Sequence, residues 1–189
     1  EDYFTMHEIG RTLDDAIGEA FDKCGKTMGF DYPAGPIIDK YSKNGNPKKF
    51  KFPIPKVKGL DFSFSGFKTS VLNFINKNIN LEQNFIKNNV EDLCASIQFT
   101  LIEILMLKIN LAVRKTGITQ IALGGGVAAN SELRIRIIRE GEKNNLKTYI
   151  PNIDYTTDNA AMIALVGYLK YKNLHLGNLK QKVLSNYKI

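Results

Sequence analysis

The chain has 189 residues, of which 43% are hydrophobic, enough for one sizeable core or two small ones. It contains no apolar run of about 18 residues and no charged-then-apolar leader, so we expect a cytoplasmic protein without a membrane span or secretion signal. The net charge of +7 suits a polyanionic partner such as a nucleic acid, although abundant Lys, Asn and Ile also fit an A/T-rich genome.

The opening residues EDYFTMHEIG lack an initiator methionine and predict an extended segment, so we expect a fragment whose beginning lies upstream. Apolar residues then recur every three or four positions, which predicts an amphipathic helix capped by Thr12 and ended by Gly29. Asp15, Glu19 and Asp22 share its other face, as either a solvated acidic stripe or one that meets a cationic or hydroxyl-rich partner.

The segment after this helix predicts a rigid proline turn in which Gly35 is free to adopt a positive φ. A short helix from Ile37 then carries Asp39 on its first exposed turn. The lysine- and proline-rich residues 46–59 predict a surface strap or hinge. Alternating apolar and polar residues over 60–64 predict a short, half-buried strand.

Two further helices are predicted before the glycine-rich region. The first follows Ser65, and the longest helix of the chain runs from about residue 82 to 115. Beyond Leu101 this long helix is apolar nearly all round, so we expect its second half to be buried centrally. Cys24 and Cys94 lie in helical patterns outside any C-x-x-C or Cys/His cluster and predict reduced core thiols.

Residues 118–140 predict a buried strand, a turn of three consecutive glycines and a helix. Glycines let a ligand approach the backbone, and the helix start offers unpaired N–H groups, so the turn is a candidate nucleotide site. Asn130 and Ser131 are then helix caps or ligand hydrogen-bonding groups. The spacing matches neither the dinucleotide fingerprint nor the Walker loop, and the alternative is a turn that binds nothing.

The last third of the chain predicts a strand over 146–151 and then a helix with small residues suited to close packing. Asp158, just before this helix, is by itself an N-cap. The tail from Asn173 predicts a loose terminal helix.

Two basic groupings stand out, and each either faces phosphates or is a solvated surface. They are Lys48, Lys49, Lys51, Lys56 and Lys58 in the strap, and Arg134, Arg136 and Arg139 on the helix after the glycines.

Five stretches occur in the order found in one known family. They are GRTLDDAIGEAFDK, YPAGP, LDFSFSGFKT, GGGVAANSELR and TTDNAAMIA. The chain thereby resembles the TsaD/Gcp family of tRNA threonylcarbamoyladenosine transferases, once labelled O-sialoglycoprotein endopeptidases. The resemblance implies the helix-rich C-terminal α/β lobe of the actin/Hsp70/sugar-kinase-like ATPase fold. Residues 1–70 would bridge to an absent N-terminal lobe, and residues 71–189 would form the C-terminal lobe with the glycine-rich nucleotide turn.

The resemblance also assigns site residues. Asp22 matches an aspartate that holds the ribose side of the nucleotide, and Gly35 matches a backbone contact in the same pocket. Asp39 occupies a ligand-contacting position that varies within the family, and Asn130 matches the substrate-binding asparagine. Asp158 matches a metal-ligand aspartate, which competes with its interpretation as an N-cap.

The family's reaction moves a threonylcarbamoyl group from threonylcarbamoyl-AMP to the exocyclic amine of the adenosine 3′ of the anticodon, in tRNAs that read codons beginning with A. It implies one divalent metal ion, iron or zinc, and an adenine nucleotide or threonylcarbamoyl-AMP as ligand. The implied partners are tRNA and companion proteins, which include a metal-less paralogue, and no membrane.

One departure limits these expectations. The family's histidine ligands lie in an H-x-x-x-H pair, whereas this chain has only the widely separated His7 and His175. Since Asp158 alone is a poor metal site, we expect these residues by themselves to be inactive. The alternatives are a non-catalytic partner lobe of the same complex and a sugar-kinase-like ATPase. The old peptidase label has no support, because the sequence offers no nucleophile with a base and an orienting group.

Overall fold

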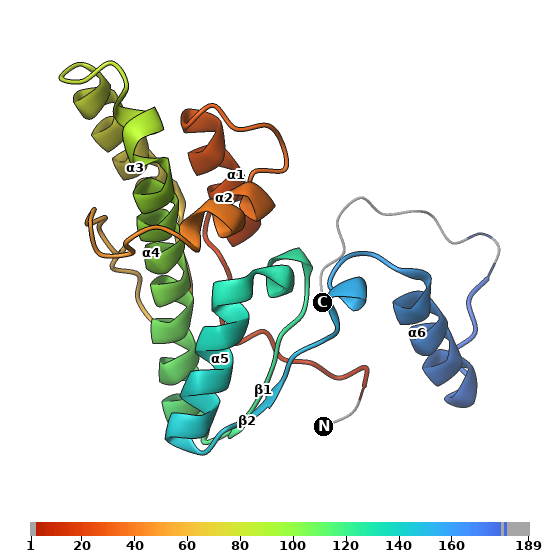
Figure 1. Ribbon diagram of the computed structural model, residues 1–189. Helices are drawn as coiled ribbons and strands as arrows, with labels where there is room; N and C mark the ends of the chain where they lie inside the picture. The colour runs from red at the N-terminus through yellow and green to blue at the C-terminus, as the bar shows by residue number, and fades with distance from the viewer. Residues whose placement is uncertain (1–2, 179, 181–189) are drawn as a thin grey trace.

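The computed structural model describes residues 3–178 and 180 and is a mixed, helix-rich α/β structure (Figure 1). Its helices and strands follow in the order α1 (Ile17–Thr27), α2 (Gly35–Ser42), α3 (Ser65–Ile79), α4 (Phe85–Thr116), β1 (Gln120–Ala122), α5 (Ser131–Asn144), β2 (Lys147–Tyr149) and α6 (Ala160–Lys172). Two short 3-10 helices, η1 (Gly126–Ala129) and η2 (Ile153–Tyr155), precede α5 and α6.

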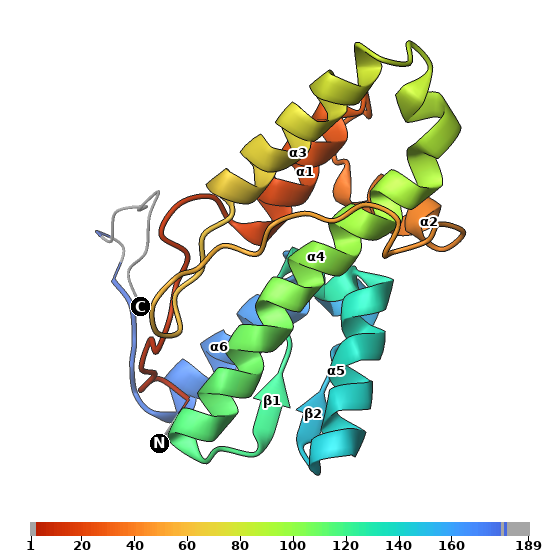
Figure 2. The same ribbon diagram turned by 90° about the vertical axis from the view of Figure 1, so that its left-hand side faces the viewer.

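Helix α4 is the spine of the fold, with α2, α3 and α5 packed along it (Figure 2). The main core joins α1, α2, α3 and α4 and includes the fully buried Phe67, Ile38 and Ile97. A smaller cluster joins α4 to α5 through Met106 and Ile137. Burying these side chains removes apolar surface from water, which is the main favourable contribution to folding.

By length and composition alone α4 would be able to cross a membrane, but its middle is buried against the other helices, as in a core helix. Burial is concentrated between Leu93 and Met106. The expectation that the whole second half is buried was therefore wrong beyond Met106, since Leu107 is 47% exposed. Cys24 and Cys94 are free and buried as predicted, and burial raises the pKa of each thiol to about 12.

Three helices have N-terminal N–H groups bound by an aspartate from an earlier part of the chain. Asp14 accepts hydrogen bonds from the N–H groups of Phe64 (2.7 Å) and Ser65 (3.3 Å) at the start of α3. Asp22 does the same for α2, and Asp39 does so for α5. Because a helix N-terminus carries orphan donors and a partial positive charge, each carboxylate stabilises the helix and fixes it to a neighbour.

The first predicted helix starts later than expected. Helix α1 begins at Ile17, and Thr12, which was expected to be its cap, forms an isolated parallel bridge with Phe62 instead. The strand predicted over 60–64 was wrong, because this bridge is its only strand-like pairing in the described chain. The end was predicted correctly, since Gly29 follows α1 with a φ of +84°.

The sheet consists of β1 and β2, paired in parallel with Ile121 opposite Thr148. Its strands are largely exposed, with Ile118 before β1 at 59% exposure, so the prediction of a buried strand was wrong in this chain. The order strand, glycine turn, helix was correct.

Helix α6 stands apart from α1–α5 in Figure 1, and none of its side chains is buried. The predicted close packing of its small residues is therefore not found. Its N-cap is Asn159, whose side chain accepts a hydrogen bond from the Met162 N–H, so the interpretation of Asp158 as the cap was wrong. Residues 173–178 are not helical, and the rest of the predicted terminal helix lies outside the described residues, apart from Lys180.

Candidate functional site

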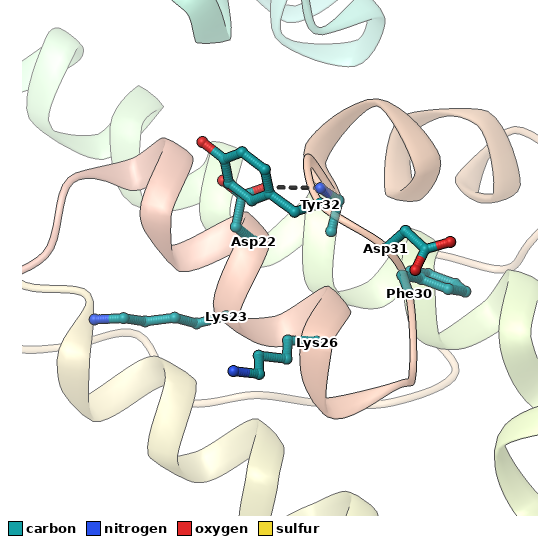
Figure 3. A pocket seen from close by; sticks show the side chains of 7 residues that line it. Asp22, Lys23, Lys26, Phe30, Asp31 and Tyr32 are labelled. Atoms are coloured by element: carbon teal, nitrogen blue, oxygen red, sulfur yellow. Dashed lines mark hydrogen bonds between the residues drawn. The ribbon is translucent and has the colours of Figure 1, made fainter.

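A pocket of about 420 Å³ opens between α1 and the loop that leads to α2 (Figure 3). Its lining mixes charged and aromatic side chains, namely Asp22, Lys23, Lys26, Phe30, Asp31 and Tyr32, and it also includes Ala34. Carboxylates bind hydroxyl groups, the Lys26 ammonium has no partner among the described residues and is free to bind an anion, and aromatic rings cover apolar faces, so this lining suits a small polar ligand with a flat part.

Asp22 is held in this pocket by two backbone hydrogen bonds. Its Oδ1 accepts hydrogen bonds from the N–H groups of Ala34 (2.8 Å) and Gly35 (3.2 Å), and Figure 3 shows the first of them. The bonds hold the carboxylate at the N-terminus of α2, where the helix dipole favours a negative charge. The same carboxylate thus shapes the loop and presents its charge to the pocket.

The other acids of the predicted stripe are engaged elsewhere. The Lys23 ammonium lies 2.6 Å from Asp15 and 2.7 Å from Glu19, and these hydrogen bonds raise the pKa of Lys23. The Lys23 ammonium thus balances the negative charges of Asp15, just before α1, and of Glu19 in α1. Of the three carboxylates, Asp22 is the one that lines the pocket.

Gly35 is the first residue of α2 and contributes its backbone N–H to Asp22. Its φ is not positive, so the turn does not use the conformational freedom that this glycine offers. A Cβ atom here would lie 3.8 Å from the Phe21 Cβ, an ordinary van der Waals distance. Internal packing therefore does not require a glycine at this position.

Asp39 connects α2 to the start of α5. Its Oδ1 accepts a hydrogen bond from the Ser131 hydroxyl (2.8 Å), and its Oδ2 accepts one from the Ser131 N–H (3.2 Å). The contact joins residues that are distant in sequence, and it links the helix that follows the second family motif to the fourth motif. Ser131 is therefore a bridging residue at the first turn of α5.

Asn130 is the N-cap of α5 and is only 9% exposed. Its Oδ1 accepts a hydrogen bond from the Leu133 N–H (3.0 Å), and its Nδ2 donates to the Oε1 of Gln98 (2.7 Å). Gln98 in turn donates from Nε2 to the Ser42 hydroxyl (2.7 Å) at the end of α2. Both ends of the Asn130 amide are thus used to hold α5 against α4 and α2.

Gln98 is a site-supporting residue that the sequence analysis missed. It is 4% exposed and lies within the apolar, buried middle of α4. A buried amide costs free energy unless its hydrogen bonds are satisfied, so a lone glutamine in such a run indicates a polar partner. That signal was present in the sequence, although it does not identify Asn130 as the partner.

The glycine turn is open to solvent. A Cβ atom added at Gly124 or Gly126 would meet no protein atom within 4 Å, so packing within the chain does not explain these two glycines. Gly125 has a φ of +81°, which does require glycine. Close approach of a ligand to the backbone would account for the other two, as expected for a phosphate-binding turn.

Arg134 is partly buried and binds the residues that follow this turn. Its guanidinium donates to the carbonyl oxygens of Ala128 (3.0 Å) and Pro151 (2.9 Å). Arg136 pairs with Glu103 at 2.7 Å, which leaves Arg139 as the exposed member of the arginine grouping. Two of the three arginines therefore have structural partners and are poorly placed to meet phosphates.

Asp158 is exposed, and no hydrogen bond or ion pair within residues 3–178 joins it to the other four predicted site residues. No group of three or more His, Cys, Asp or Glu side chains in the described part of the chain is arranged to hold a metal ion. These residues therefore do not by themselves fit a divalent metal, which needs several ligands.

The structure thus brings together four of the five predicted positions. Asp22 and Gly35 share a hydrogen bond, Asp39 binds Ser131, and Asn130 is the residue before Ser131. Asp158 lies apart from this group, ahead of α6. The four positions lie at or within about one turn of the N-termini of α2 and α5, apart from Asp22, which binds the start of α2 from α1.

Comparisons with known proteins place the chain in a family. The family model TsaD, described as tRNA N6-adenosine threonylcarbamoyltransferase, matches residues 1–165. A curated protein of that name from Christiangramia forsetii is 51% identical over 187 residues, covering 99% of this chain and 55% of that protein. Another from Riemerella anatipestifer is 52% identical over 189 residues, covering 100% of this chain and 55% of that protein.

A third relative of the same name, from Cytophaga hutchinsonii, is 48% identical over 169 residues, which is 89% of this chain and 49% of that protein. The chain therefore spans about half the length of the curated relatives it matches. The extent of the family match and the identity to these relatives together show that the chain belongs to the TsaD family.

Proposed function

We propose that the complete protein of which this chain is part transfers a threonylcarbamoyl group from threonylcarbamoyl-AMP to a tRNA. The acceptor would be the exocyclic amine of the adenosine 3′ of the anticodon, in tRNAs that read codons beginning with A. The observation that carries the proposal is the family match over residues 1–165, since it includes all four clustered site positions. An actin/Hsp70/sugar-kinase-like lobe, with a division near residue 70, is part of the same proposal.

The geometry supports separate roles for two parts of the chain, one that binds the ribose of the adenylate and one that faces its phosphate. Asp22, held at the α2 N-terminus, would accept hydrogen bonds from the ribose hydroxyls of the adenylate. The open glycine turn and the start of α5 would face its phosphate. Gly35, Asp39 and Asn130 remain proposed binding positions, and their hydrogen bonds make them positioning groups for these two helix starts. A fixed site makes attack on the bound donor effectively unimolecular.

The proposed divalent metal, iron or zinc, would take Asp158 as one ligand and would need further ligands from outside the described residues. For this reason we derive no step of the reaction through the metal, and we expect the 189-residue chain alone to bind the donor weakly and not to turn over. Companion proteins of the pathway and a cytoplasmic location belong to the same proposal.

The test compares the complete protein with the isolated chain. Each is incubated with threonylcarbamoyl-AMP, unmodified tRNA and the companion proteins, and the modified nucleoside is measured by mass spectrometry after digestion. We expect product from the complete protein, none from the isolated chain, and a loss of about 100-fold for Asp22→Ala in the complete protein. Transfer of the threonylcarbamoyl group by the isolated chain would contradict the prediction that this chain alone is inactive.

The alternatives predict other results from the same assay. A non-catalytic partner lobe would give no product in the complete protein but would raise the activity of a catalytic relative. A sugar-kinase-like ATPase would transfer phosphate from ATP to a small hydroxylated acceptor without tRNA. Either outcome, with an inactive but folded complete protein, would overturn the proposed transferase.

A further inference from the structure

The lysine strap, residues 46–59, carries the highest density of positive charge in the chain. No Asp or Glu occurs between residues 40 and 60, whereas the strap itself contains Lys48, Lys49, Lys51, Lys56 and Lys58. The strap forms no helix or strand and crosses α4 on the side of the molecule that faces the viewer in Figure 2.

Fixed contacts hold the strap along α4 from end to end. The Asn46 N–H donates to Asp92 (2.7 Å), and the Phe50 N–H donates to the Ser96 hydroxyl (3.2 Å). At the other end, the Lys108 ammonium donates to the carbonyl oxygens of Val57 and Gly59, both at 2.8 Å. From Asp92 to Lys108 the helix rises about 24 Å, so the strap displays its charges over roughly that length.

The aromatic residues of the strap point inward and anchor it. Phe52 is buried against Phe67, with ring centroids 5.8 Å apart, and Phe50 packs on Phe74 at 5.2 Å. Neither ring is available to stack on a nucleobase. The strap lysines are exposed, so any nucleic acid they meet would be bound through its phosphates.

Lys49 is the one strap lysine with a structural partner among the described residues. Its ammonium lies 2.6 Å from Asp92, and it also donates to Asn89 at the kink of α4. Lys48, Lys51, Lys56 and Lys58 are exposed, and their ammonium groups take part in no hydrogen bond or ion pair of the described chain. Nearby acids are already engaged, since Asp92 binds Lys49, Glu91 binds Asn44 and Asp61 binds the Arg11 N–H.

We propose that Lys48, Lys51, Lys56 and Lys58 form a phosphate-binding track for the backbone of the tRNA substrate, on the opposite side of α4 from the glycine turn. This inference rests on the proposed function for the identity of the RNA. Unpaired ammonium groups on an anchored segment suit a polyanion, because binding releases the counterions condensed on the phosphates. The track would hold the body of the tRNA and would contribute nothing to recognition of its bases.

The experiment compares two quadruple variants of the complete protein that have the same net charge. The first is Lys48→Gln, Lys51→Gln, Lys56→Gln and Lys58→Gln. The control replaces the exposed lysines Lys77, Lys87, Lys115 and Lys143 by Gln, all of which lie outside the strap. Lys49 is retained in both, so the contact with Asp92 is kept and neither variant removes a structural hydrogen bond.

Binding of unmodified tRNA is measured by fluorescence anisotropy at several salt concentrations between about 50 and 200 mM. We expect the strap variant to bind about 10- to 100-fold more weakly at the lowest salt, with a slope of log affinity against log salt that is smaller by about 3. The control variant should lose less than about threefold. The loss should be the same for tRNAs that read A-starting codons and for other tRNAs, because only phosphates are contacted.

Binding of AMP by the same variants reports on the donor site and should be unchanged. Equal losses of tRNA affinity in both variants would overturn the track and leave the proposed function intact. Retained tRNA binding with loss of binding to phosphatidylglycerol vesicles would also overturn it, in favour of an acidic lipid surface. If the unsubstituted complete protein binds no tRNA, the track and the proposed function both fail.

Discussion

Helices α4 and α6 are both rich in apolar residues, but the fold surrounds one of them and leaves the other bare. Side chains of α4 from Leu93 to Met106 are packed against α2, α3 and α5. In α6, by contrast, Ile163 is 68% exposed and Leu165 is 59% exposed. Apolar composition predicts that a helix needs a partner surface, but it does not say whether the same chain supplies that surface.

The hydrogen bonds show the same contrast between the two regions. Around α4, aspartates from an earlier part of the chain bind the N-terminus of a helix, as Asp14, Asp22 and Asp39 do. The cap of α6 is local, from Asn159 to Met162 within the same segment. We therefore expect substitutions around α4 to lower the free energy of unfolding of the isolated chain strongly, and substitutions in α6 to change it little.

The largest effect should come from the core that α3 and α4 share. Phe67 is fully buried and contacts Phe52, so Phe67→Ala should destabilise the chain by about 3–5 kcal/mol, because it removes apolar contacts and leaves a cavity. Urea denaturation followed by circular dichroism measures the difference. Phe67→Leu is the control and should cost about half as much. A loss under about 1 kcal/mol for the alanine variant would show that the core is not close-packed.

A smaller effect should come from the caps between elements. Asp39→Ala removes both hydrogen bonds to Ser131 and should cost about 1–2 kcal/mol. Asp39→Asn retains an acceptor oxygen for one of these bonds and should cost less than the alanine variant. Hydrogen exchange of the first turn of α5 should speed up in the alanine variant. Unchanged exchange and stability would mean that Asp39 does not fix α5 to α2.

The pH dependence of stability tests one anchor of the strap. Hydrogen bonds from the Asn46 N–H and the Lys49 ammonium outweigh burial and lower the pKa of Asp92 in the folded chain. A carboxyl whose folded pKa is depressed contributes stability above its unfolded pKa and loses that contribution as the pH falls through the folded value. Stability should thus decline below about pH 4, and Asp92→Asn should remove under about 1 kcal/mol of that decline. Identical acid limbs for both proteins would contradict the contribution of Asp92.

Much of the helical architecture could be predicted from the sequence, because apolar residues at three-four spacing mark the buried stripe of a helix. This holds for α3, α5 and most of α4. The errors occurred where a distant partner decides the local structure. Residues 60–64 alternate like a strand, but the described chain provides only Thr12 as a bridge partner. Helix α1 starts late, and Asp14 before it accepts hydrogen bonds from the N–H groups of Phe64 and Ser65.

The positions of the candidate site were predicted from the motifs, but the hydrogen bonds that connect them were not. The motifs identified Asp22, Asp39 and Asn130 as separate positions along the chain. That Asp39 binds Ser131 and that Asn130 binds Gln98 depends on how α2, α4 and α5 are packed, and no local pattern encodes this. The role of Asp158 stays a prediction, since the residues that would complete a metal site are not among those described.

The smallest effect is expected in α6, and it makes the contrast with α4 quantitative. Ile163→Ala should change the stability of the isolated chain by less than about 0.5 kcal/mol, because the side chain is already in water and alanine favours helix slightly. The matched substitution Leu101→Ala in α4 should cost about 2–5 kcal/mol, since Leu101 is fully buried. In the complete protein the cost of Ile163→Ala should rise if a further part of the chain covers α6. A cost that is large in the isolated chain would show instead that α6 is packed in solution and that the contrast between the two helices is wrong.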